Sequence, residues 1–99
     1  MERVYALARK LDALGHPLRL RIISILRTNG AMHMALLASN LGVSRALVKI
    51  HMKKLEQAGL VRSWVEMAPG QAKALRMYEL IDFEITVNPD SIAREVNGR

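Results

Sequence analysis

A tight turn between two short helical segments constrains the fold of this chain more than any other feature of its sequence. The turn is Gly42-Val43-Ser44, in which the glycine can end one helix and the Ser44 hydroxyl can accept a backbone N–H at the start of the next. Apolar residues at helical spacing flank the turn over residues 34–41 and 45–58. The sequence therefore predicts two helices that meet at a fixed angle.

The chain changes from helical to strand character after Gly59. Residues 60–68 and 75–83 are rich in valine, leucine, isoleucine and aromatic residues, and Pro69-Gly70 lies between them. We therefore expect a β-hairpin, here called the wing, over residues 60–83, with a loop longer than the tightest turns.

Two further helices are expected before the turn. Apolar residues spaced three and four apart predict a helix over residues 1–14, and a second one is expected from Pro17 to Asn29, where Gly30 is expected to form a left-handed cap. Residues 31–34 are interpreted as a link. The tail, residues 84–99, is expected to be extended at first and to form a short helix after Pro89.

Together these elements favour a mainly α fold with a β-hairpin wing, in a single winged helix-turn-helix domain over residues 1–99, with the helix-turn-helix at 34–58. Such a fold presents one helix of the pair to a partner surface. The charge of the chain indicates which class of partner this helix contacts.

The charge is basic and unevenly distributed. The net charge is +6 and the isoelectric point is about 10.3. No acidic residue occurs between Ala13 and Leu55. The basic residues of that block are Arg19, Arg21, Arg27, Arg45, Lys49, Lys53 and Lys54. A one-sided basic block attracts a polyanion such as nucleic acid, although a solvated basic surface is the alternative on charge alone.

The helix expected at 45–58 has two different faces. Successive residues turn by about 100° around a helix. One side carries Val48, His51, Met52 and Leu55, which we expect to pack on the preceding helices. The other side carries Ala46, Lys49, Ile50, Lys53 and Gln57, flanked by Arg45 and Lys54. A helix that enters the DNA major groove needs such a long, basic face.

The residues of that face suit different kinds of contact with DNA. Arg45 and Lys49 can donate to guanine edges, and Ala46 permits close approach of the backbone. Lys53 and Lys54 are placed for phosphates, which set the register of binding. The apolar Ile50 fits a thymine methyl group; the alternative is that it packs on a neighbour or is simply exposed.

The expected wing loop offers a second set of contacts. Gln71, Lys73 and Arg76 lie at or near the tip of the hairpin. Such residues bind a phosphate backbone or enter a minor groove, although a few basic residues on a hairpin can also serve only as a soluble edge.

At this level the sequence resembles the ArsR-type (arsenical-resistance repressor) winged-helix family of bacteria and archaea. The stretches that carry the likeness are Leu14-Gly15-His16-Pro17-Leu18-Arg19-Leu20-Arg21-Ile22-Ile23, Leu37-Ala38-Ser39-Asn40-Leu41-Gly42-Val43-Ser44, Val48-Lys49-Ile50-His51-Met52-Lys53-Lys54-Leu55, Glu56-Gln57-Ala58-Gly59-Leu60-Val61 and Tyr78-Glu79-Leu80. Together they cover roughly residues 11–81, and their order is more specific than any one of them.

The resemblance implies a homodimer that binds a specific operator and usually represses transcription. It places the recognition positions at Ser44, Arg45, Ala46, Lys49 and Ile50. The family's dimer uses N- and C-terminal segments, but the proline in this tail argues against the usual C-terminal dimer helix. The apolar stripe Val4, Leu7, Leu11 and Leu14 is therefore the better candidate for the dimer interface, with packing inside one chain as the alternative.

Several other classes of protein are disfavoured. The chain has no cysteine, and His16, His33 and His51 lack metal-ligand spacing, so we expect no metal site and no cofactor; Met32-His33-Met34 is only a weak candidate for Cu(I). No catalytic motif indicates an enzyme. No signal peptide or membrane span is evident, so a cytoplasmic location is expected.

The sequence thus predicts a sequence-specific, double-stranded DNA-binding transcription regulator. Two alternatives remain open at this stage. One is a winged-helix module that binds other proteins, and the other is a chromatin-type protein that binds DNA without sequence preference.

Overall fold

A computed structural model describes residues 2–70 and 72–98. It has five helices and a small three-stranded sheet, which confirms the expected mainly α architecture. The elements in chain order are α1 (Glu2–Leu14), α2 (Pro17–Asn29), β1 (Met32–His33), α3 (Met34–Leu41), α4 (Arg45–Gln57), β2 (Val61–Met67), β3 (Ala74–Leu80) and α5 (Pro89–Asn97).

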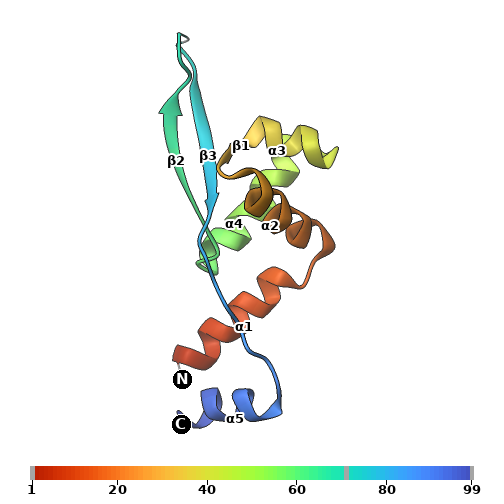
Figure 1. Cartoon of the computed structure of the whole chain (residues 1–99), viewed down its shortest axis with the longest axis vertical. Helices are drawn as coiled ribbons and strands as arrows, with labels where there is room; N and C mark the ends of the chain where they lie inside the picture. Colours follow the sequence, from red (N-terminus) through yellow and green to blue (C-terminus); the bar gives the residue numbers. More distant parts are fainter. Residues whose placement is uncertain (1, 71, 99) are drawn as a thin grey trace.

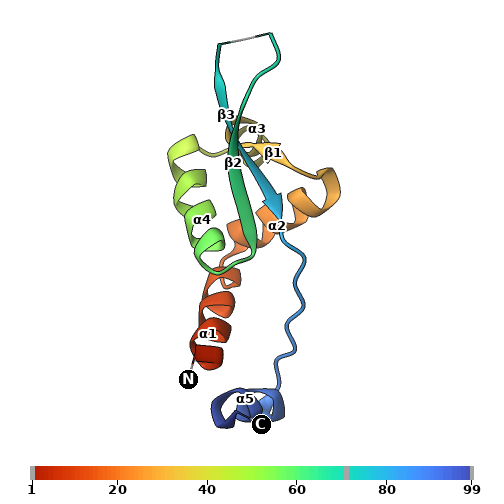
Figure 2. The ribbon, with the colours of Figure 1, turned by 90° about the vertical axis from the view of Figure 1, so that its left-hand side faces the viewer.

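The molecule is elongated, with principal-axis extents of 53 × 23 × 22 Å. The β2–β3 hairpin projects at one end, and α1 and α5 lie at the other end together with both chain termini (Figure 1). Between these ends, α2, α3 and α4 pack against the base of the sheet (Figures 1 and 2). The molecule therefore has a hairpin end and a terminal end, joined by the helical core.

The core forms where these helices meet the sheet. Its fully buried side chains are Ile22, Leu26, Leu37, Val48, Met52, Leu55 and Leu60. Val48, Met52 and Leu55 come from α4 and belong to the inner face that helical periodicity predicted. Burial of each such side chain contributes about 1.5–3 kcal/mol, so this cluster fixes the orientation of α4.

The helix-turn-helix corner has the expected local chemistry. Gly42 ends α3 in the left-handed conformation, with φ +69° and ψ 33°. The Ser44 hydroxyl then accepts a hydrogen bond from the Leu47 backbone N–H at 3.1 Å and caps α4. Because glycine adopts a positive φ without steric cost, the chain turns here within a few residues.

The sheet is larger than the sequence indicated. Residues 31–34 were expected to be a link, but Met32–His33 form β1, which pairs antiparallel with β3. The strand order is β1-β3-β2, with Met32 opposite Tyr78 and Val61 opposite Leu80. A two-residue strand shows no periodicity of its own, because its pairing partner lies far away in the sequence.

The expected bounds of the wing were too wide at both ends. Leu60 precedes β2 and residues 81–83 follow β3, so the paired strands are shorter than 60–83. Gly30 also differs from expectation. Its φ of +78° is combined with a ψ of −162°, which is outside the left-handed helical region, although its N–H still bonds to the Leu26 carbonyl.

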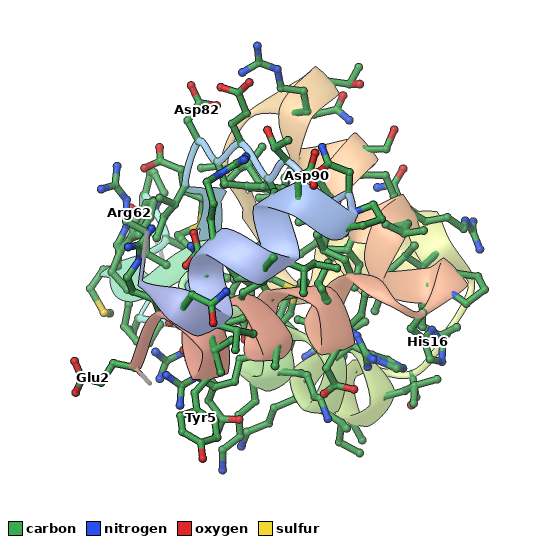
Figure 3. All side chains as sticks on the ribbon, turned by 90° about the horizontal axis from the view of Figure 1, so that it is seen from below. Glu2, Tyr5, His16, Arg62, Asp82 and Asp90 are labelled. Atoms are coloured by element: carbon green, nitrogen blue, oxygen red, sulfur yellow. The ribbon has the colours of Figure 1, made fainter. Side chains whose placement is uncertain are left out.

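The tail contains a full helix. Residues 81–87 run extended along the molecule, and α5 then lies against α1 (Figures 2 and 3). Asn88 and Ser91 form a reciprocal capping box at its start. The expected extended stretch and the short helix near Pro89 are thus confirmed, and Pro89 occupies the first helical turn, where its missing N–H has no partner to lose.

Candidate nucleic-acid interface

The outer face of α4 is basic and open to solvent. Val48, His51, Met52 and Leu55 are buried, as the periodicity of the helix indicated. The side chains of Arg45, Ala46, Lys49, Ile50 and Lys53 are all exposed. The helix therefore presents the long basic surface that was expected of it.

Ile50 is an unusual member of that surface. Its side chain is 65% exposed, so the alternative in which it packs on a neighbour does not hold within this chain. A largely exposed isoleucine is stabilised when an apolar group of a partner covers it, because apolar surface then leaves water. A thymine methyl group is such a partner in the major groove.

Ser44 lies at the start of the same helix, where its hydroxyl is used as the N-cap. The side chain remains exposed. Capping of α4 accounts for a serine at this position, and a contact between Ser44 and DNA stays a prediction.

The wing and α4 together line a basic groove, which we define by Arg45, Lys49, Lys53, Lys73 and Arg76. One depression is bordered by Arg45, Lys73 and Arg76, and a second is bordered by Lys49, Lys53 and Arg76 together with the acidic Glu56. Arg76 of β3 is common to both, and it also donates to the Ser63 hydroxyl at 3.3 Å. Residues up to about 30 positions apart in the sequence thus converge beside one helix face.

Of the predicted phosphate contacts on α4, Lys54 lies outside this groove. Gln71 is not among the described residues. Lys54 was expected to contact phosphate, but its Nζ atom lies 2.8 Å from Asp12 Oδ2 on α1, on the side of α4 that faces the terminal end. The Lys54 ammonium holds the pKa of the Asp12 carboxyl below its usual value, first by its hydrogen bond and then by its charge.

The basic block is also smaller on the surface than in the sequence. Arg19 is 9% exposed and hydrogen-bonds within the protein. Arg27 lies 3.4 Å from Asp82 of the tail. Arg21 stays exposed on α2, and Arg45, Lys49 and Lys53 are the residues of the block that line the basic groove.

All three histidines have structural roles, and for His16 and His33 these are capping roles that the sequence did not reveal. His16 Nδ1 accepts from the Leu18 backbone N–H at 3.0 Å and caps α2. His33 Nδ1 accepts from Leu36 N–H at 3.3 Å and caps α3. His51 is buried beside Arg19, with Arg19 Nη1 at 2.9 Å from its Nδ1 atom. A partly buried, hydrogen-bonded His51 was the expected state.

The apolar stripe on α1 does not form one exposed surface. Leu14 packs against the core, and Leu7 borders a depression beside the tail residues Ile85 and Thr86. Val4 is half-buried and Leu11 is 38% exposed. The most exposed apolar side chain of α1 is instead Tyr5, which projects outward from the terminal end (Figure 3).

Over residues 2–70 and 72–98, the structure contains no group of three or more His, Asp or Glu side chains that could hold a metal ion. In the same part of the chain, no helix combines the length and apolar character that a membrane crossing requires.

Comparison with known proteins gives consistent matches. Residues 16–62 match a family described as winged helix-turn-helix DNA-binding. An uncharacterised HTH-type transcriptional regulator of Methanocaldococcus jannaschii is 32% identical over 83 residues, which is 84% of either chain.

Solved structures share the fold. A transcriptional regulator homologue from Pyrococcus horikoshii OT3 superposes with a TM-score of 0.66 at 23% identity, covering 98% of this chain and 89% of that one. A possible transcriptional regulator for arsenical resistance gives a TM-score of 0.57 at 25% identity, covering 88% and 76%. The likeness thus extends over most of the chain.

Proposed function

This chain belongs to the winged helix-turn-helix family of DNA-binding transcriptional regulators, and from that premise we propose that it works as a homodimer that binds a specific operator and represses transcription. The observation that carries the proposal is the basic groove, where the exposed face of α4 and cations of the wing converge. We assign it no enzymatic activity and no cofactor, and place its action in the cytoplasm.

The contacts that we propose for each of these residues follow from its position on α4 or on the wing. Arg45, Lys49 and Ile50, near the start of α4, contact base edges in the major groove, while Ala46 lets the backbone approach. Lys53, Lys73 and Arg76 bind phosphates on either side, because they lie further along α4 or on the wing. Ser44 still caps α4 and in addition contacts the DNA backbone.

Two observations support an ArsR-type identity, and repression is proposed because the resemblance to that family implies it. The motifs on residues 11–81 favour that family, and one structural neighbour is named as a possible regulator for arsenical resistance. The ArsR-type assignment here is without the cysteines that would hold a metal, so we propose no metal-dependent release from DNA.

Selection of bound duplexes from a random pool, followed by titration, tests the function. We expect an enriched pseudo-palindrome with half-sites about 34 Å apart, bound at least about 10³-fold more tightly than random sequence. Strong, salt-sensitive binding without an enriched sequence would instead assign a chromatin-type role. Absence of binding even at low salt would favour a module that binds other proteins.

The homodimer is proposed to form through the terminal end, where both α1 and α5 expose apolar side chains. Tyr5 is 61% exposed, and Ile92 and Val96, one turn apart on α5, are 41% and 49% exposed. Residues i and i+4 share one face of a helix, so these two form an exposed apolar stripe on α5. An exposed stripe of this kind is typical of a surface that a partner covers.

We expect the Val96→Glu variant to be monomeric at protein concentrations where the wild type sediments as a dimer. A carboxylate in an apolar interface would lose hydration without gaining a partner. Ser24→Glu on α2 adds the same charge at an exposed position away from the terminal end and serves as the control. A dimer that persists in Val96→Glu, or a wild type that is monomeric throughout, would contradict this interface.

A further inference from the structure

A buried arginine joins α1, α2 and α4 at one point. Arg19 of α2 is 9% exposed. Its Nε donates to the Ala13 carbonyl at 2.6 Å and its Nη2 donates to the Asp12 carbonyl at 3.3 Å. Both carbonyls belong to the last turn of α1, where backbone acceptors have no partner within the helix. The remaining nitrogen, Nη1, lies 2.9 Å from His51 Nδ1 on α4.

The chemistry of this contact fixes the protonation state of His51. A guanidinium carries only hydrogen-bond donors and stays charged, so His51 Nδ1 must be the acceptor. A neutral ring with its proton on Nε2 offers that acceptor, whereas a protonated ring has donors on both nitrogens. Burial, followed by the nearby charges of His16 and Arg19, lowers the pKa of His51 below its ordinary value of 6.5.

The groups around His51 are predominantly basic. The His16 ring, at the junction of α1 and α2, has its centroid 4.6 Å from that of His51. Lys54, one turn away on α4, is paired with Asp12 of α1. The segment of α3 carries no charged or titratable side chain. On β2, Arg62 hydrogen-bonds to Glu79 of β3 and Glu66 accepts from Trp64, and neither carboxylate is buried. A proton on His51 would therefore face Arg19 with no buried carboxylate to compensate.

We propose that Arg19 is a positioning residue for DNA recognition, which acts through neutral His51 to fix the recognition helix α4 to the last turn of α1. The inference rests on the proposed function. It adds that this buried contact, together with the hydrophobic core and the Lys54–Asp12 ion pair, sets the orientation of α4 relative to the last turn of α1. Protonation of His51 breaks the contact, since it removes the acceptor and brings two cations together.

The direction of the pH effect follows from the lowered pKa of His51. As the pH falls below about 6.5, the unfolded chain takes up a proton at this histidine before the folded protein does. The stabilisation from the Arg19–His51 contact is thus fully present above that pH. It is lost as the pH falls from there to the lowered pKa of the folded state. In the folded protein the contact persists until His51 itself takes up the proton, so binding to the operator should weaken as the pH falls through the lowered pKa of folded His51. Added positive charge alone would instead strengthen binding to any DNA.

The free protein provides the first test, by NMR of ¹⁵N-labelled histidine side chains. We expect His51 at neutral pH to show an unprotonated Nδ1 and a protonated Nε2. On acidification its protonation should coincide with shifts of the backbone amides in the last turn of α1 and in α4. A proton on Nδ1 at neutral pH, or protonation of His51 that leaves these amides unchanged, would overturn the proposal.

The second test is the ratio of affinities for the selected duplex and a random duplex, measured from about pH 7.5 down to the pH at which the NMR titration shows His51 protonated. For the wild type we expect this ratio to fall by about fivefold or more. In His51→Asn, the amide oxygen replaces Nδ1 as acceptor and does not titrate, so the ratio should stay nearly constant. His16→Asn keeps the acceptor that caps α2 and should still show the fall, with its midpoint at higher pH because the charge of His16 no longer lowers the pKa of His51.

An equal fall in the wild type and His51→Asn would overturn the proposal, as would a constant wild-type ratio. Arg19→Lys adds a check on geometry, because one ammonium cannot span the three acceptors that the guanidinium contacts. For Arg19→Lys, the ratio of affinities for the selected and random duplexes should already be low at neutral pH. Far-UV circular dichroism should show that this variant is still folded. If no duplex binds at all, the proposed function fails, and the NMR titration alone decides on the Arg19–His51 contact.

Discussion

Replacing Leu55 with alanine is expected to lower the free energy of unfolding by about 2–5 kcal/mol. Leu55 is fully buried on the inner face of α4, a helix that packs against α1, α2, α3 and β2. Truncation removes burial and leaves a cavity that these rigid neighbours fill only in part. Because domains of this size have only about 5–15 kcal/mol of stability, the loss would be a large fraction of the total.

Urea unfolding at a fixed protein concentration measures the effect, since the stability of a dimer depends on concentration. Gln57→Ala serves as the control, because Gln57 is exposed on the same helix and the change should be within about 0.5 kcal/mol. A loss below about 1 kcal/mol in Leu55→Ala would show that α4 is not anchored as described.

The second large effect concerns the two lysines on the outer face of α4. Lys49→Ala should weaken binding to the selected duplex by about 1–3 kcal/mol for each half-site, so by about 2–6 kcal/mol for a dimer that occupies both. Binding to random DNA should change much less, because a base contact contributes only where the correct base is present.

Lys53→Ala is the matched comparison, one turn further along the same exposed face. It should weaken binding to both duplexes alike and reduce the slope of log affinity against log salt by about 1 for each phosphate that the variant no longer neutralises. Titrations at several salt concentrations separate the two effects. Equal losses of affinity on both duplexes for Lys49→Ala would show that Lys49 does not read a base, and an unchanged slope for Lys53→Ala would show that Lys53 does not bind phosphate.

The features that could be predicted from the sequence are those encoded locally. The turn at Gly42-Val43-Ser44 and the inner face of α4 depend on residues within one or two helical turns, so periodicity and capping rules were sufficient. The exposed basic face of α4 followed from the same periodicity. The convergence of Lys73 and Arg76 with that face depended further on the order of elements, because a hairpin that directly follows α4 must fold back beside it.

The features that could not be predicted are of two kinds: local caps made by an unusual residue type, and contacts across the fold. Histidine is not among the usual N-cap residues, so His16 and His33 gave no signal for that role. Arg19 and Lys54 were assigned to the basic block, because nothing in the neighbouring sequence shows that the end of α1 lies beside them. The number of basic residues in a block can thus be read from the sequence. Which of them are exposed and which make contacts inside the protein depends on how the helices pack.

The extended segment 81–87 has a consequence for how this architecture tolerates changes in length. One residue inserted within α1 would rotate the preceding part of that helix by about 100° and displace it by about 1.5 Å relative to α4. One residue added to the extended segment adds at most about 3.6 Å of reach and imposes no rotation. Variation in length should therefore accumulate in the segment that leads to α5, while α1 keeps a fixed number of residues between the terminal end and the core.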